Sequence, residues 1–162
     1  MKQTLIVVFA LLISACATQN TNQVTQVDNF AIKNSNEQIE QIVALQKEEC
    51  MRPEYVVLRK KSPCASRDIT FAELTDATKM TNAQKVLFIK AVAVLDVYSN
   101  QITDIYRQLG TPEAIKVVDA REWLQSQNMN NRLELVERKI TWGVYLRNRQ
   151  QMDSEMLRRA KN

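Results

Sequence analysis

Carboxylate side chains are the main groups in this sequence that could carry catalysis, because none of the 162 residues is a histidine. The absence of histidine excludes a Ser-His-Asp or Cys-His nucleophile pair, a histidine-ligated zinc and a histidine proton shuttle. Two carboxylates suffice for glycoside hydrolysis, so four acids are candidates for a peptidoglycan-acting enzyme: Glu48, Glu49, Glu73 and Glu122. None of them lies in a recognisable catalytic motif, and the sequence has neither a glycine-rich phosphate loop nor a metal-ligand cluster. We therefore expect no catalytic residue, no metal and no cofactor, and an enzyme is the least favoured class.

Cys16 ends an N-terminal segment with the pattern of a secretory signal. Lys2 supplies a positive charge, and residues 5–13 form an unbroken apolar run. This run is too short for a membrane-spanning helix, which needs about 20 residues. The ending Ile13-Ser14-Ala15-Cys16 resembles the lipobox of bacterial lipoproteins. The resemblance covers residues 1–16 and implies cleavage before the cysteine, a diacylglyceryl thioether on its sulfur and an acyl chain such as palmitate on its amino group.

The lipobox also has implications for localisation. In lipoproteins an aspartate directly after the cysteine favours retention in the inner membrane, whereas Ala17 stands here. The resemblance therefore implies a lipid anchor in the inner leaflet of the outer membrane, facing the periplasm, and two or three acyl chains make such an anchor stable. An ordinary secretory peptide or a short anchor helix is the alternative. Export excludes nucleic acid as a partner.

Cys50 and Cys64 lie fourteen residues apart, on either side of a stretch that contains two prolines. In an oxidising compartment we expect them to form a structural disulfide, and the loop closure contributes about 3 kcal/mol in the chain-entropy model. A redox-active pair normally has the Cys-x-x-Cys spacing, and a metal site would need two further ligands. Both remain less favoured alternatives.

Two basic regions are candidates for binding a partner. Arg59, Lys60 and Lys61 give the expected disulfide loop a positive excess that could meet an acidic protein surface, anionic lipid or a glycan. In the last helix the candidates are Trp142, Tyr145, Arg147 and Arg149. Tryptophan, tyrosine and arginine dominate interface hot spots. The alternatives are a solvated charged surface for both regions and core burial for the two aromatic residues.

The composition predicts an all-α fold. Two glycines and three prolines are too few turn formers for a β-sandwich or barrel. Residues 16–34 are rich in Gln, Asn and Thr without helical periodicity, which predicts a flexible tether. The sequence thus divides into a signal peptide at 1–15, a lipidated tether at 16–34 and one helical domain at 35–162.

Helix signals recur through the expected domain. Capping boxes that begin at Ser35, Thr70 and Thr81 predict three helix starts. The third helix is predicted to run to Leu109, where Gly110-Thr111-Pro112 predicts a tight turn and an antiparallel return. We therefore expect a disulfide-stapled bundle of about four to five helices, two of them long and antiparallel.

Other details of the bundle are also predicted. Residues 51–69 are predicted to form a loop, in which the strand-like composition of residues 54–58 allows a short extended piece. Apolar residues nearly all round 86–97 place that half-helix in the middle of the bundle. The return helix is predicted at about 112–127, and Asn128-Met129-Asn130 is a linker to a last helix that carries Leu133, Val136, Ile140 and Val144 on one face. Gly143 inside that helix predicts a close crossing or a kink.

These features favour a non-catalytic envelope lipoprotein that binds a protein partner or assists assembly. The alternative is an inhibitor or immunity-type lipoprotein that blocks an envelope-active enzyme or toxin with a protruding rigid loop. At the level of architecture alone, a small helical lipoprotein with one disulfide resembles secretion pilotins, which escort outer-membrane pore subunits. That resemblance implies an apolar groove between helices that takes an amphipathic partner helix.

Overall fold

The computed structural model describes residues 19–162, with side chains from residue 31 onward. All regular elements in this range are helices, which confirms the all-α prediction. The α-helices are α1 (Gln19–Cys50), α2 (Val56–Arg59), α3 (Phe71–Leu74), α4 (Asn82–Leu109), α5 (Pro112–Val136) and α6 (Trp142–Lys161), and two 3-10 turns lie at Pro53–Tyr55 and Ser66–Asp68. The predicted signal peptide and Cys16 lie outside the described residues.

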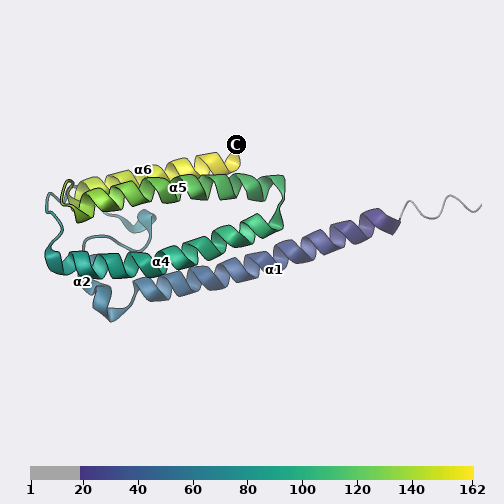
Figure 1. The fold of residues 1–162 in the computed structure, drawn as a ribbon, viewed down its shortest axis with the longest axis horizontal. Coiled ribbons are helices and arrows are strands. Elements are labelled where there is room, and N and C mark those ends of the chain that lie inside the picture. The colour runs from purple at the N-terminus through teal and green to yellow at the C-terminus, as the bar shows by residue number, and fades with distance from the viewer. Residues whose placement is uncertain (1–18) are drawn as a thin grey trace, which may run out of the picture.

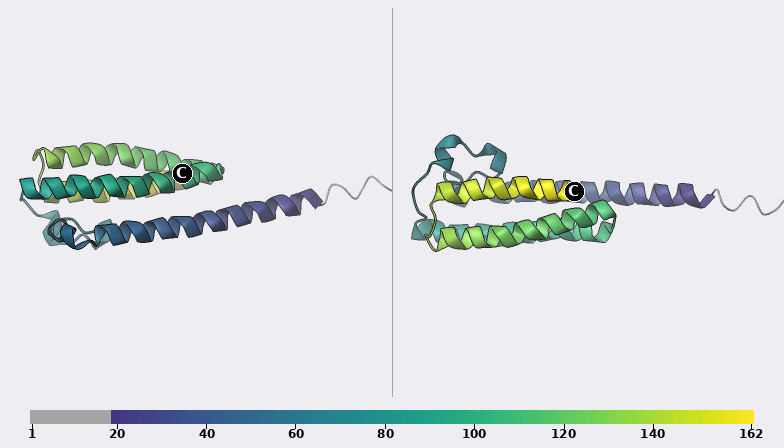
Figure 2. Two further views of the ribbon diagram at one scale, coloured as in Figure 1. Left: turned by 60° about the horizontal axis from the view of Figure 1, so that its bottom comes forward. Right: turned by 90° about the horizontal axis from the view of Figure 1, so that it is seen from above.

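The four long helices run side by side (Figure 1). α4 and α5 form an antiparallel hairpin, α6 returns along α5, and α1 lies along α4. The N-terminal half of α1 extends beyond the end of the hairpin in all three views (Figure 2). The chain between α2 and α4, which includes α3, crosses to α6 and packs on it.

Local capping sets several of these boundaries as predicted. Thr70 with Glu73 and Thr81 with Gln84 form reciprocal capping boxes at the starts of α3 and α4. Gly110 ends α4 with a left-handed φ of 62°, a conformation that glycine adopts without a steric penalty. The Thr111 side chain then accepts a hydrogen bond from the Ala114 N–H and caps α5.

The start of α1 differs from the prediction. The helix begins at Gln19 and passes through Ser35, so residues 19–34 of the predicted tether are helical. Glutamine is a good helix former, and asparagine and threonine cost at most about 0.7 kcal/mol per residue. A helix already formed over residues 35–50 can therefore extend upstream, because propagation is much easier than nucleation.

Two further boundaries correct the sequence-based assignment. Residues 53–59 form a 3-10 turn and α2 instead of an extended piece, and they bury Tyr55 and Leu58. α5 continues through the predicted linker at 128–130 and ends at Val136, so Leu133 and Val144 belong to different helices. Tertiary contacts explain the continuous helix: the buried Asn131 side chain donates to the Tyr145 carbonyl and accepts from Asn148 of α6. The break falls instead at 137–141, where Arg138 has a φ of 60°.

The main core lies where α4 begins, α5 ends and α6 begins. Phe88, Trp142 and Tyr145 contact one another edge to face with ring centroids about 6 Å apart. α4 packs only one face against this core, because Val86 and Val97 are 70% and 55% exposed. The prediction that residues 86–97 run through the middle of the bundle is therefore wrong, although α4 is long and apolar enough by composition to cross a membrane.

Gly143 is the second residue of α6, where it meets another backbone segment, instead of marking the helix crossing or kink that was predicted for a glycine inside the last helix. Its N–H donates to the Asp76 carbonyl at 2.9 Å. A Cβ atom added at Gly143 would lie 2.5 Å from the Leu74 carbonyl oxygen, far inside contact distance. The segment that approaches is the chain leaving α3, so glycine is required here to let two backbones meet.

Candidate functional site: a cleft beside the disulfide

A cleft lies between the end of α1, the disulfide loop and the sides of α4, α5 and α6. It has two adjoining lobes of about 370 and 460 Å³. Both lobes are lined by Gln46, Cys50, Cys64, Leu95, Ser99, Arg121, Asn128 and Arg132. Phe88, Ala91 and Val92 give the first lobe an apolar floor. The cleft thus combines an apolar floor with polar and charged walls, an arrangement that can bind a ligand and fix its orientation.

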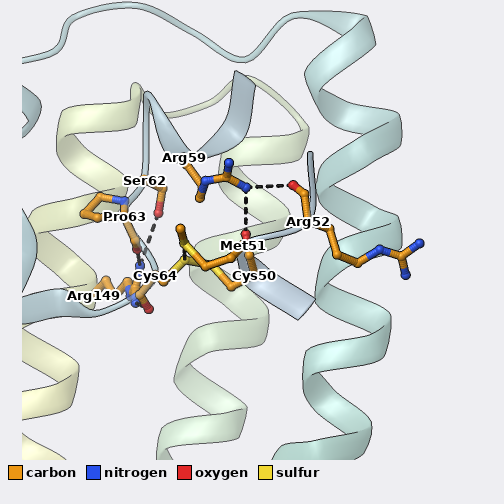
Figure 3. The surroundings of a disulfide bond; sticks show 8 residues. All are labelled: Cys50, Met51, Arg52, Arg59, Ser62, Pro63, Cys64 and Arg149. Carbon is orange, nitrogen blue, oxygen red and sulfur yellow. Dashed lines mark hydrogen bonds between the residues drawn. A yellow bond between two sulfur atoms is a disulfide. The ribbon is translucent and has the colours of Figure 1, made fainter. Parts of the chain in front are cut away.

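The predicted disulfide between Cys50 and Cys64 is confirmed and forms part of the wall of both lobes (Figure 3). The two cysteine Cα atoms are 6.0 Å apart. The bond joins the last residue of α1 to the segment that packs on α6. It therefore fixes the end of α1 against the rest of the bundle.

Arg59 and Arg149 hold the backbone on either side of this disulfide, as Figure 3 shows. Arg59 Nη1 donates to the carbonyl oxygens of Cys50 and Arg52 at 3.0 and 2.7 Å. Arg149 donates to the carbonyl oxygens of Pro63 and Cys64, both at 2.8 Å. Both arginines were predicted to bind a partner, and the structure shows them in intramolecular contacts that position the loop.

The other predicted basic residues divide between internal contacts and solvent. Lys61 Nζ lies 2.8 Å from Asp76 Oδ2, and Arg147 donates to the Leu74 carbonyl. Partial burial would raise the pKa of Asp76, but hydrogen bonds from Lys61 and Thr78 outweigh it and lower the pKa below its ordinary value. The Lys60 side chain is exposed. The loop therefore uses most of its positive charge to hold itself in place.

Trp142 and Tyr145 were predicted either to form a partner-binding edge or to lie in the core. Their side chains are 0% and 5% exposed and belong to the aromatic core. Tyr145 also lines the first lobe of the cleft beside Phe88. Burial favours the alternative of core packing for both residues, and a partner contact at either one stays a prediction.

The four candidate catalytic acids do not converge on one site. Glu49 is buried and accepts hydrogen bonds from Tyr55 Oη at 3.1 Å and Arg52 Nη1 at 3.2 Å. Burial and the hydrogen bond to Glu49 raise the pKa of Tyr55. Glu73 caps α3, Glu122 pairs with Arg107 on the outer surface, and Glu48 is exposed.

Arg121 is the charged residue of the cleft that the sequence analysis missed. Its Nε donates to Thr103 Oγ1 at 2.9 Å, and its Nη2 donates to the Ser99 carbonyl at 3.0 Å and to Ser99 Oγ at 3.1 Å. These three bonds to α4 fix a half-buried guanidinium group at the wall that the two lobes share. Burial lowers the pKa of Arg121, and no carboxylate among the described side chains pairs with it.

A sequence signal for Arg121 does exist. The residues three and four positions away on the same helix face are Val117, Val118, Leu124 and Gln125. An arginine on an exposed helix surface commonly has an acid at one of these positions. An arginine with apolar neighbours at three of the four lies on an inward face, where its charge needs a partner from elsewhere.

Arg132 occupies the other end of the α5 wall. Its Nη1 lies 2.8 Å from Asp96 Oδ1 of α4, and both side chains are partly buried. This pair balances its own charge within the cleft. Asn128 lies between Arg121 and Arg132 on the same wall, so the α5 side of the cleft carries one paired and one unpaired arginine with an amide between them.

Residues 19–162 contain no group of three or more side chains suited to hold a metal ion. No protein-family model matches the chain, and no curated protein or solved structure shows significant similarity to it.

Proposed function

We propose that this protein is a lipid-anchored lipoprotein of the outer membrane, facing the periplasm, that binds a protein partner during envelope assembly. The cleft between α1 and the α4–α6 bundle is its binding site. The observation that carries this proposal is the form of the cleft, which combines an apolar floor with polar walls and two continuous lobes. These are the properties of a groove that accepts a segment of another chain, with apolar contacts for affinity and a few polar contacts for orientation.

The attachment of α1 supports the same conclusion. α1 packs along α4 and meets the α5–α6 side of the cleft mainly through the disulfide at its end. The two lobes beside α1 are the space available to a partner segment. An amphipathic helix could fill this space, which is the binding mode that the pilotin-like architecture implies.

The inhibitor alternative receives less support from the disulfide loop. That hypothesis requires a rigid loop that protrudes into another protein's site. Tyr55 and Leu58 of the loop are 2% and 7% exposed, and Arg59 and Lys61 tie the loop to neighbouring segments. The loop is rigid, but it is packed into the bundle.

Site-specific photocrosslinking in cells tests the binding site. A crosslinking residue is placed at Gln46 or Asn128, which line the cleft, and separately at Glu48 or Ser126, which are exposed and lie outside it. We expect the two cleft positions to crosslink to one envelope protein and the two control positions to give no such product. Equal crosslinking from all four positions would contradict the assignment of the cleft.

The anchor requires a separate test, because Cys16 lies outside the described residues. In Cys16→Ala we expect the radiolabelled acyl chain to be absent and the protein to leave the membrane fraction after alkaline carbonate extraction. A wild-type level of acyl label on Cys16→Ala would contradict the lipobox assignment without affecting the cleft.

A further inference from the structure

We infer that the cleft recognises its partner through a single carboxylate group, which pairs with Arg121. The inference rests on the proposed function, since it identifies the chemistry by which the partner segment is held. The partner is a peptide segment with an acidic side chain among apolar residues.

The first argument is the state of Arg121 itself. Its Nε and Nη2 are bonded to Ser99 and Thr103, whereas its Nη1 makes no hydrogen bond to a described residue. A partly buried cation has lost much of its hydration and gains from an opposite charge that enters the site. A ligand carboxylate in either lobe can supply that charge without moving the guanidinium group.

The second argument is the charge of the surrounding cleft. The first lobe is lined by four arginines and two acids, Glu49 and Asp153. Asp96 pairs with Arg132, Arg59 donates to loop carbonyl groups through Nη1, and Arg149 does so through Nη1 and Nη2. The cleft thus has an excess of positive charge that favours an anionic ligand. Arg121 is a half-buried arginine of this cleft that neither pairs with a carboxylate nor donates to a loop carbonyl group.

The third argument favours a carboxylate over a phosphate group. Arg121 and Arg132 are eleven residues apart on α5, about 16 Å along the helix axis at 1.5 Å per residue. Arg121 is held by Ser99 and Thr103 and Arg132 is held by Asp96, so neither guanidinium group is free to turn toward the other and share one phosphate. A single guanidinium fork matches one carboxylate in charge and geometry, and the apolar floor suits the rest of an amphipathic helix.

A displayed library of amphipathic 16-residue helical peptides, with one face randomised, tests the inference. Peptides are selected on the wild-type protein, and each binder is also prepared with its acidic residue changed to Gln. We expect the binders to carry Asp or Glu and to lose at least tenfold in affinity against Arg121→Gln, about 1.4 kcal/mol. We expect Arg121→Lys to retain part of the affinity, because it keeps the charge but lacks the fork.

Lys139→Gln is the matched control, because it removes the same charge at an exposed position in the turn before α6. The Gln form of each peptide should bind wild type and Arg121→Gln equally, which tests the pairing even if the protein variant is less stable. Binders that protect the cleft from hydrogen exchange but are insensitive to Arg121 and to their own acid would overturn the inference and leave the proposed function standing. Failure of all binders to protect the cleft would count against the proposed function itself.

Two small anions identify the chemistry of the ligand. Acetate and inorganic phosphate are compared as competitors of a bound peptide at equal ionic strength. We expect acetate to compete at least as well as phosphate. Displacement by phosphate at a clearly lower concentration would overturn the assignment of a carboxylate.

Discussion

Leu135, Trp142 and Leu146, where α5 meets α6, have no exposed surface, whereas no side chain of α1 between residues 31 and 48 is buried. Both regions are regular helix, and α1 is the longest helix that the structure describes. The α5–α6 region also has the buried Asn131, which bonds across the helix pair. α1 is held by one side against α4 and by the disulfide at its end.

The difference shows that the length of a helix does not report its contribution to stability. Burial of apolar surface contributes about 25 cal/mol per Å², and the α5–α6 junction has far more of it than α1. A helix with little buried surface can change position at low cost. The weakly attached helix α1 is therefore the wall of the cleft that can change position at the lowest cost.

A leucine-to-alanine substitution should have a large effect in the core and almost none in α1, and the largest effect is expected in the core. Leu135→Ala removes a side chain with no exposed surface and leaves a cavity, so we expect a loss of about 2 to 5 kcal/mol in the free energy of unfolding. Urea unfolding followed by circular dichroism measures it. A loss below about 1 kcal/mol would mean that the core collapses around the cavity.

Removal of the disulfide tests the attachment of α1. We expect the double variant Cys50→Ser, Cys64→Ser to lose about 3 kcal/mol in the free energy of unfolding, the value for a closed loop of this length. Amide hydrogen exchange should rise most at the end of α1 and in residues 51–63. An exchange pattern that rises equally in α6 would show that the two regions are one cooperative unit.

A smaller effect is expected at low pH in the last turns of α6. Hydrogen bonds from Arg158, and then from Arg159, lower the pKa of Glu155 from 4.5 to about 2. Because the folded pKa is depressed, the stabilisation is complete above about 4.5 and is lost as the pH falls toward 2. An NMR titration of the Glu155 carboxyl carbon should show this pKa, and Glu155→Gln should remove the associated loss of α6 structure. A midpoint near 4.5 would show that the contacts to Arg158 and Arg159 are not maintained in solution.

The smallest effect is expected for Leu45→Ala in α1. Leu45 is 44% exposed and alanine is a better helix former, so we expect the free energy of unfolding to change by less than about 0.5 kcal/mol. The measurement is the same urea unfolding as for Leu135→Ala. A loss above about 2 kcal/mol would show that α1 packs against the bundle more closely than its exposure indicates.

Local signals in the sequence predicted those parts of the fold that neighbouring residues determine. The capping boxes of Thr70 and Thr81 and the turn at Gly110 depend on side chains within a few positions of each boundary. The signal at Ser35 failed because the same residue types also fit inside a helix. The break between α5 and α6 was predicted too early, at residues 128–130, because contacts to α6 hold Asn131 inside α5. The actual break was missed because an arginine, Arg138, adopts the left-handed conformation there instead of a glycine.

The candidate site could be predicted only in part, because residues far apart in the sequence form it. The cysteine spacing predicted the disulfide, but nothing local to Arg121 reveals that Ser99 and Thr103 of α4 hold its guanidinium group. The basic residues of the disulfide loop were predicted to meet a partner's surface, because their contacts within the chain also could not be read from the sequence. Arg59 instead donates to carbonyl groups of its own chain, and the spacing of residues in the sequence does not reveal these contacts.

Because the disulfide forms part of the cleft wall, the form of the cleft depends on whether Cys50 and Cys64 are oxidised or reduced. Before the disulfide forms, Cys50 and Cys64 are two thiols, and the cleft wall lacks the bond that joins the end of α1 to the segment packed on α6. A reducing compartment keeps such thiols unpaired, and an oxidising one joins them. Under the proposed export, the cleft wall would be completed only after the chain leaves the cytoplasm.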